Sequence, residues 1–267
     1  MSVGTVVRKD LADAGRSRAL WAVTLVVVVS TAGIVGMVAA TSDEGVTRVF
    51  QLAFQLAVLT LPIVALVLAK GAITLERESG SLRLLLSLPP SRRDVLVGKF
   101  LGRAGLMLAA TLLGGAATGL VVVTMLGGDL ATLVPFVGFL GLMGIAFVGV
   151  GVGISAASAS DGRATAFAVA FYVILVVLWN LIQQGILAGA SVLGLLEAGS
   201  EPAWVQFIGM FPPSRAAIAG YDAAVGGGHV FDPNLVTSVW FPALLLVAWT
   251  VVPVAAGFVR FRDADIG

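Results

Sequence analysis

Six apolar stretches, each long enough to cross a lipid bilayer, dominate this 267-residue chain. A transmembrane helix needs roughly 20 apolar residues, because it rises about 1.5 Å per residue across a hydrocarbon core about 30 Å thick. Backbone polar groups can be satisfied within lipid only in helices and closed barrels. The sequence therefore predicts an all-α membrane protein with six transmembrane helices. The predicted spans are residues 20–40, 49–69, 104–126, 130–157, 164–196 and 235–259, of which the fourth and fifth are long enough for tilt, a kink or an interfacial turn.

The composition excludes several classes of function. Hydrophobic residues make up 58% of the chain and charged residues 12%, whereas a soluble domain carries about a quarter charged residues. The net charge of +1 argues against a nucleic-acid-binding protein, which needs clustered Lys and Arg. The chain has no cysteine, which removes thiol nucleophiles and Cys-based metal sites. Ser155 and Ser158 lack a nearby base, and the single histidine, His229, has only Asp232 beside it, so we expect neither a catalytic residue nor a metal site.

The distribution of basic residues predicts the orientation. The two terminal segments and the loops on the same side of the membrane as the N-terminus carry 14 of the 16 Lys and Arg residues. Only Arg48 and Arg215 lie on the other side. The positive-inside rule then places both termini in the cytoplasm. Before the first span, apolar residues recur at helical spacing, which favours an amphipathic interfacial helix over residues 3–18. A frayed polar tail is the alternative.

The predicted spans contain amides and glycines but no ionisable side chain in their apolar cores. This weakens an ion-coupled carrier, because such carriers usually bind the coupling ion on an intramembrane charge. Glycines, including Gly149, Gly151 and Gly153, favour close helix approach, although membrane helices are rich in glycine in any case. The amides either join helices by hydrogen bonds or line a translocation path. They are Gln51 and Gln55 on the second predicted span, and Asn180, Gln183 and Gln184 on the fifth.

A charged loop, residues 71–102, joins the second and third spans on the predicted cytoplasmic side. With Lys70 and Arg103, which flank it, this segment contains ten of the 31 acidic and basic residues of the chain. Thr74 is a candidate helix cap for a short amphipathic helix that Gly80 interrupts and Pro89-Pro90 ends. Ser91, with Asp94 three residues later, predicts the cap of a new helix that continues into the third span.

Basic and acidic residues of this loop have different explanations. The loop projects Glu76, Arg77, Glu78 and Arg83 on a small surface. Contacts with lipid headgroups and the determination of topology account for the basic residues. They do not account for the acidic ones, which an anionic inner leaflet would repel, so a protein partner is the better explanation of the acidic pair.

The segment "AITLERESGSLRLLLSLPPSRRDVLVGKFLGR" resembles the signature of ABC-2 type transporter permeases. In that family an acidic stretch is followed by leucines, a turn of small residues and proline, basic residues, and a Gly-Lys pair that enters the third span. The resemblance extends over residues 1–267 as a single transmembrane domain, and is strongest to the permease type associated with maturation of nitrous-oxide reductase. The matching positions are Glu76, Glu78, Gly80, Leu82, Leu84, Leu85, Leu86, Ser87, Pro89, Ser91, Arg92, Gly98 and Lys99.

The resemblance implies one subunit of an exporter. Two copies of this chain, as a homodimer, would pair with two copies of a separate ATPase that docks on the charged loop. This chain itself has no G-x-x-x-x-G-K-[ST] motif, so the partner would bind ATP and Mg²⁺, and no cofactor is expected here. The residues expected to couple to the ATPase are Glu76, Arg77, Glu78, Gly80, Leu82 and Arg83.

The predicted outer loop, residues 197–234, is rich in aromatic residues and interrupted by prolines. Aromatic residues favour the membrane interface, so we expect short helices that dip into the outer leaflet, and the resemblance implies re-entrant helices there. Two alternatives to a transporter permease remain open: a membrane scaffold or assembly factor without transport, and an ion-coupled secondary transporter.

Overall fold

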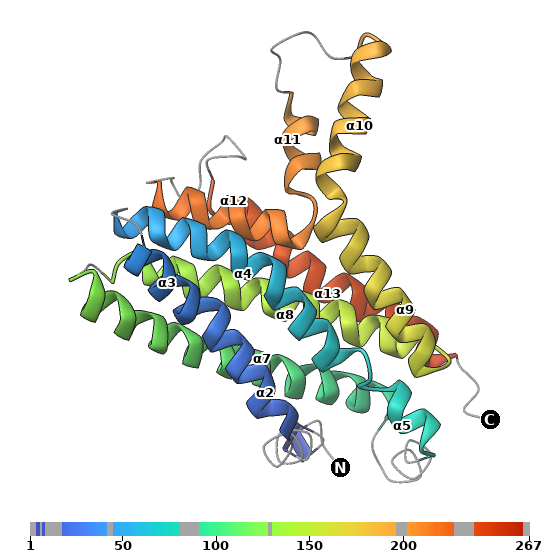
Figure 1. Cartoon of the computed structure of the whole chain (residues 1–267). Coiled ribbons are helices and arrows are strands. Elements are labelled where there is room, and N and C mark those ends of the chain that lie inside the picture. The colour runs from blue at the N-terminus through green and yellow to red at the C-terminus, as the bar shows by residue number, and fades with distance from the viewer. Residues whose placement is uncertain are drawn as a thin grey trace.

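The computed structural model consists of helices joined by turns in the part of the chain that it describes (Figure 1). The described residues are 4–5, 7–8, 18–41, 45–80, 91–127, 130–195, 202–226 and 238–263, and none of them lies in a strand. This confirms the all-α prediction. Most of the predicted interfacial helix over residues 3–18 falls outside the described residues.

The helices follow one another in the order expected of a multi-span membrane protein. The first predicted span consists of α2 (Arg18–Val28), a π-helical turn η1 (Val29–Gly33) and α3 (Ile34–Thr41). Next come α4 (Val46–Ala69), α5 (Thr74–Glu78), α7 (Arg92–Met125) and α8 (Leu133–Ala157). The remaining elements are α9 (Asp161–Tyr172), the π-helical turn η2 (Val173–Val177), α10 (Trp179–Val192), α11 (Ala203–Met210), α12 (Pro213–Val225) and α13 (Trp240–Arg262).

Five of the six predicted spans are helices long and apolar enough to cross a membrane. They occupy Trp21–Thr41, Val46–Glu78, Arg92–Met125, Leu133–Ala157 and Trp240–Arg262. The remaining prediction, residues 164–196, differs from the structure because this segment is not one straight helix. The segments Asp161–Val177 and Trp179–Val192 meet at an angle of 59°, so the count is six only if this bent pair forms one span.

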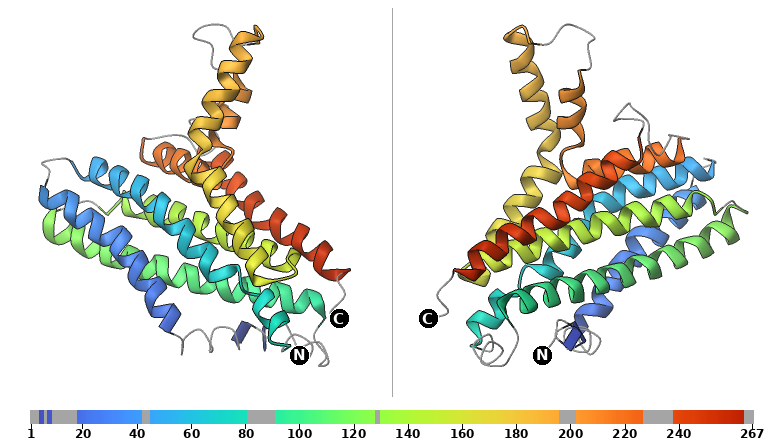
Figure 2. Two further views of the ribbon diagram at one scale, coloured as in Figure 1. Left: turned by 45° about the vertical axis from the view of Figure 1, so that its right-hand side comes forward. Right: turned by 180° about the vertical axis from the view of Figure 1, so that it is seen from behind.

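The bend follows a local change in backbone hydrogen bonding. Leu178 N–H donates to the carbonyl of Val173, five residues earlier, at 2.8 Å. Such π-type turns break the regular ladder and often accompany bends. Beyond the bend, α10 leaves the bundle and projects together with α11 (Figures 1 and 2), and the Trp179 indole N–H donates to the Ile208 carbonyl at 3.1 Å.

Helix α8 lies at the centre of the bundle and packs against α4, α7 and α13. Its contact with α13 is close because glycines face backbone: a Cβ atom built at Gly149 would lie 2.6 Å from the Thr250 carbonyl oxygen, and one at Gly257 would lie 2.6 Å from that of Gly153. The prediction that glycines permit close helix approach is confirmed at this contact.

The two ends of the bundle differ in charge. We call one end the basic end; it is defined by Lys70, Arg77, Arg92, Arg163 and Arg260, and it holds α5, the starts of α7 and α9, and the ends of α8 and α13 (Figure 1). Arg92 joins two of these elements, because its Nη1 donates to the carbonyls of Phe261 at 2.7 Å and Arg262 at 3.0 Å.

At the opposite end, α12 packs against α4, α8 and α13. The Tyr221 ring is almost fully buried and stacks on Phe54 with ring centroids 4.5 Å apart, and Phe136 meets Phe50 edge to face at 5.0 Å. The predicted outer loop thus contains two helices, α11 and α12, of which α12 is part of the packed bundle. His229 and Asp232 lie outside the described residues.

Candidate coupling site

The turn after α4 is held by one buried serine of α8. Residues 70–73 form the turn, and the backbone N–H groups of Ile73 and Thr74 donate to Ser155 Oγ at 3.0 and 3.2 Å. The expectation that Thr74 caps the next helix is wrong: Ile73 occupies the N-cap position and Thr74 is the first helical residue. The Thr74 hydroxyl instead donates to Asp161 Oδ1 at 3.2 Å. Thr74 is buried against α9, and its backbone N–H already donates to the hydroxyl of Ser155.

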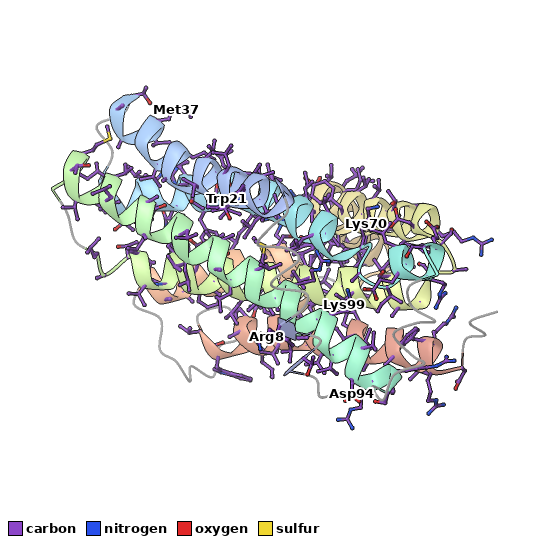
Figure 3. The ribbon with its side chains drawn as sticks, turned by 90° about the horizontal axis from the view of Figure 1, so that it is seen from below. Arg8, Trp21, Met37, Lys70, Asp94 and Lys99 are labelled. Atoms are coloured by element: carbon purple, nitrogen blue, oxygen red, sulfur yellow. The ribbon has the colours of Figure 1, made fainter. Side chains whose placement is uncertain are left out.

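Two ion pairs connect this turn and α5 to neighbouring helices. Lys70 Nζ lies 2.7 Å from Asp161 Oδ2 and also donates to Thr165 Oγ1 at 2.7 Å. Glu76 Oε1 lies 2.7 Å from Lys99 Nζ on α7. Lys70, Lys99 and Asp94 lie toward the same end of the bundle, and Met37 lies toward the other (Figure 3). These side chains are mostly shielded from solvent, so the pairs are screened less than surface pairs.

Two further hydrogen bonds attach α5 to the connection between α8 and α9. Arg77 Nη1 donates to the Ser158 carbonyl at 2.8 Å. Asp161 N–H, at the start of α9, donates to Glu78 Oε1 at 2.8 Å. A carboxylate in this position satisfies one of the unpaired N–H groups at a helix N-terminus and interacts favourably with the helix dipole. Glu76 and Glu78, which the sequence analysis assigned to contacts with a protein partner, therefore each bind a group within this chain.

The other predicted coupling residues lie at or beyond the end of α5. Gly80 has a φ of 74°, a left-handed conformation that glycine adopts without strain. Leu82 and Arg83 lie outside the described residues. After them, Ser91 and Asp94 form the predicted capping box, with Asp94 N–H donating to Ser91 Oγ at 3.2 Å and Ser91 N–H donating to Asp94 Oδ2 at 2.9 Å. The predicted second helix of the loop is confirmed.

One exposed apolar residue on α5 was missed by the sequence reasoning. The Leu75 side chain is 55% exposed, whereas Glu76 and Arg77 are partly buried. The signal was present in the sequence as a leucine directly beside the charged run Glu76, Arg77, Glu78. Only the packing shows that Glu76 and Arg77, which follow it, are partly buried while the leucine is exposed.

The predicted path residues fall on two separate parts of the fold. Gln51 and Gln55 lie on α4 in the bundle, and the other three lie on α10, which projects from it (Figure 1). Asn180 Oδ1 accepts a hydrogen bond from Arg215 on α12. Gln183 lies against α11, since a Cβ atom at Gly209 would come within 3.2 Å of its Nε2. Asn180 and Gln183 thus contact neighbouring helices, as the helix-joining alternative expects.

A narrow groove of about 200 Å³ lies between α4 and α9. Two of its lining residues make polar contacts: Lys70 pairs with Asp161, and the Tyr172 hydroxyl donates to the Leu59 carbonyl at 3.0 Å. Within the described ranges, no three His, Cys, Asp or Glu side chains are close enough together to hold a metal ion. The groove is lined by Ile63, Leu66, Val67, Lys70, Thr165, Ala168, Val169 and Tyr172.

Comparison with known proteins gives one consistent result. Residues 4–266 match the family described as "ABC-2 family transporter protein". A probable ABC transporter permease protein NosY from Pseudomonas aeruginosa is 30% identical, and the alignment covers 97% of this chain and 98% of that protein. A second probable ABC transporter permease protein NosY, from Stutzerimonas stutzeri, is 28% identical with the same coverage of both chains. With its apolar helices, the chain is therefore a multi-pass protein of the cell membrane that belongs to the ABC-2 family of transporter permeases.

Proposed function

We propose that this chain is the membrane-spanning subunit of an ATP-driven exporter, and that α5 receives the motion of a separate ATPase. The ATPase would bind ATP and Mg²⁺, and two copies of it would pair with two copies of this chain as a homodimer. The basic end would face the cytoplasm, in accordance with the positive-inside rule. Family membership favours a transporter permease over an ion-coupled carrier, and the resemblance in the charged loop supports export.

The attachment of α5 to three helices is the observation that carries this proposal. Glu76 pairs with Lys99 on α7, Arg77 donates to the end of α8, and Glu78 accepts from the first residue of α9. Helices joined by several short, partly buried polar contacts move as one unit, because separating them leaves charged groups without partners. A force applied to α5 would therefore move the starts of α7 and α9 together.

The bend between α9 and α10 extends this coupling toward the opposite end. Helix α9 begins at Asp161, which contacts Lys70, Thr74 and Glu78. Past the bend, Asn180 on α10 is bound by Arg215 of α12. A rotation of α9 at the basic end would be transmitted through the bent segment to α10, α11 and α12. These helices would then act as the gate on the far side, with Gln51 and Gln55 of α4 along the path and Asn180 and Gln183 of α10 joining the gate helices.

The exposed surface of α5 is the place to test ATPase docking. Charge reversal at Glu76 would break its pair with Lys99 and so could not separate docking from folding. Leu75→Ala breaks no ion pair and truncates a side chain that is 55% exposed. Leu112→Ala on α7 is a matched control, because that leucine is 54% exposed and Leu75 is 55% exposed.

The experiment is co-purification of the tagged full-length chain with its ATPase, followed by transport assays in proteoliposomes. Truncating an interface anchor costs about 1 kcal/mol or more, so Leu75→Ala is expected to reduce the bound ATPase about five-fold while Leu112→Ala retains it. Equal retention in both variants would remove α5 as the docking surface. A stable complex that shows neither stimulated ATP hydrolysis nor ATP-dependent flux would instead identify a scaffold.

A further inference from the structure

A second cavity, of about 420 Å³, lies between α8, α9 and α13 at the basic end. Its volume falls at the lower end of the range of small-molecule sites, which is about 300 to 1,000 Å³. It is separate from the groove between α4 and α9 because no lining residue is shared. We call it the α8–α9–α13 cleft; it is lined by Ile154, Ala157, Ser158, Phe167, Phe171 and Arg260.

Two polar side chains of the cleft lack partners in the described part of the chain. Ser158 is 3% exposed, and its Oγ is buried without a hydrogen-bond partner. Arg260 is exposed in the last turn of α13, and among the described residues no carboxylate or other acceptor binds its guanidinium. Buried polar groups normally find partners, and the unused Ser158 hydroxyl lines the same cleft as the exposed Arg260 guanidinium. The pair indicates room for an anionic, oxygen-bearing group.

The walls of the cleft are apolar. Phe167 and Phe171 lie one turn apart on α9, and Phe167 is 61% exposed. Ile154 and Ala157 of α8 line the facing side. Arg163 lies one turn before Phe167 on the same face of α9, at the basic end. The site is thus cationic at its outer edge and apolar further into the bundle.

We propose that the α8–α9–α13 cleft binds one anionic phospholipid, with its phosphate at Arg260 and Ser158 and its first acyl segment against Phe167 and Phe171. Arg260 lies in the last turn of a span that ends at Arg262, which is the depth of lipid headgroups. Basic pockets between transmembrane helices are known to bind anionic headgroups. A free phosphate ion would gain nothing from the apolar walls, so a lipid is the better occupant.

The bound lipid has a structural consequence that does not depend on the proposed coupling to an ATPase. The carbonyl of Ser158 holds Arg77 at 2.8 Å, and the hydroxyl of the same residue would contact the lipid phosphate. Binding would therefore fix the end of α8 relative to α9 and α13. We expect it to stabilise the chain against heat.

The test uses the full-length chain in detergent, with lipid binding measured by native mass spectrometry and stability by thermal unfolding. Dioleoylphosphatidylglycerol is expected to bind at least ten-fold more tightly than dioleoylphosphatidylcholine and to raise the unfolding temperature. Arg260→Gln should lower the phosphatidylglycerol affinity at least five-fold more than Arg262→Gln. The control removes the same charge two residues later, from an exposed arginine that pairs with Asp263 at 2.8 Å, and it reports the general attraction of basic residues for anionic lipid.

A second variant tests the cavity without changing any charge. Ala157→Phe places a ring in the cleft and should abolish the preference for phosphatidylglycerol. Equal losses in the two arginine variants, an unchanged preference in Ala157→Phe, or equal stabilisation by both lipids would overturn the proposal. Stabilisation by inorganic phosphate alone to the same extent would also overturn it, because the occupant would then be a soluble anion.

Discussion

The contact between α8 and α13 should not tolerate a side chain at Gly149. A Cβ atom there would lie 2.6 Å from the carbonyl oxygen of Thr250 and 3.0 Å from its Cα. Ordinary contacts between heavy atoms need about 3.5 Å or more. Since the obstructing atoms are backbone, no rotamer change relieves the overlap, and α13 would have to move away by about 1 Å.

The cost of Gly149→Val follows from this geometry. Overpacking a close contact typically costs about 1–3 kcal/mol, and the upper end applies because a whole helix must shift. Replacing glycine in a helix regains at most about 1 kcal/mol. The expected net loss in the free energy of unfolding is therefore about 2 kcal/mol, which corresponds to a fall of about 4–8 °C in melting temperature for a chain of roughly this size.

Tryptophan fluorescence during heating of the detergent-purified protein measures this change. Gly138→Val is the matched control on the same helix, because a Cβ atom at Gly138 has no other atom within 4 Å. The control should melt at or slightly above the temperature of the unmodified protein. A Gly149→Val variant as stable as the control would refute the close α8–α13 contact.

Two further substitutions test buried polar groups of opposite kinds. Tyr221 is buried and its hydroxyl has no partner among the described residues, so Tyr221→Phe should leave the free energy of unfolding unchanged or raise it by up to about 1 kcal/mol. A clear fall in melting temperature would mean that the hydroxyl is bound. Burial also raises the pKa of this hydroxyl above its ordinary value of about 10, so it stays protonated up to at least about pH 9. The difference in melting temperature between Tyr221→Phe and the unmodified protein should therefore be the same at about pH 6 and about pH 9. Ser155→Ala removes the acceptor of two buried backbone N–H groups in the turn after α4. It should lower the free energy of unfolding by about 1–3 kcal/mol and make amide hydrogen exchange over residues 70–78 faster. Unchanged exchange would show that Ser155 does not hold the turn.

Prediction from the sequence succeeded where a local pattern has a single physical solution. Long apolar runs must form helices in lipid, and five of the predicted spans appear as helices, although the second extends to Glu78 and the third begins at Arg92, well outside the predicted 49–69 and 104–126. The capping box of Ser91 and Asp94 was readable because cap residues have a fixed spacing. The charged loop carried the family resemblance, which the comparison with known proteins confirmed.

Prediction was limited where the outcome depends on contacts between distant residues. The bend at Leu178 has no proline or glycine to signal it. Thr74 has the right side chain for a cap, but Ser155, 81 residues away, already binds its backbone N–H. The first feature is a local change of backbone hydrogen bonding that carries no residue signature, and the second depends on packing against α8, which local propensity does not encode.

By itself, the sequence determined that this is a helical membrane protein of the ABC-2 family, because hydropathy, charge asymmetry and the loop pattern are local properties of the chain. The tertiary structure decided which charges meet. It paired Glu76 with Lys99, placed Glu78 at the start of α9, and left Leu75 and Arg260 exposed at the basic end. Electrostatic partners depend on distances of a few ångströms between residues that are far apart in the chain, and only the packed bundle fixes those distances.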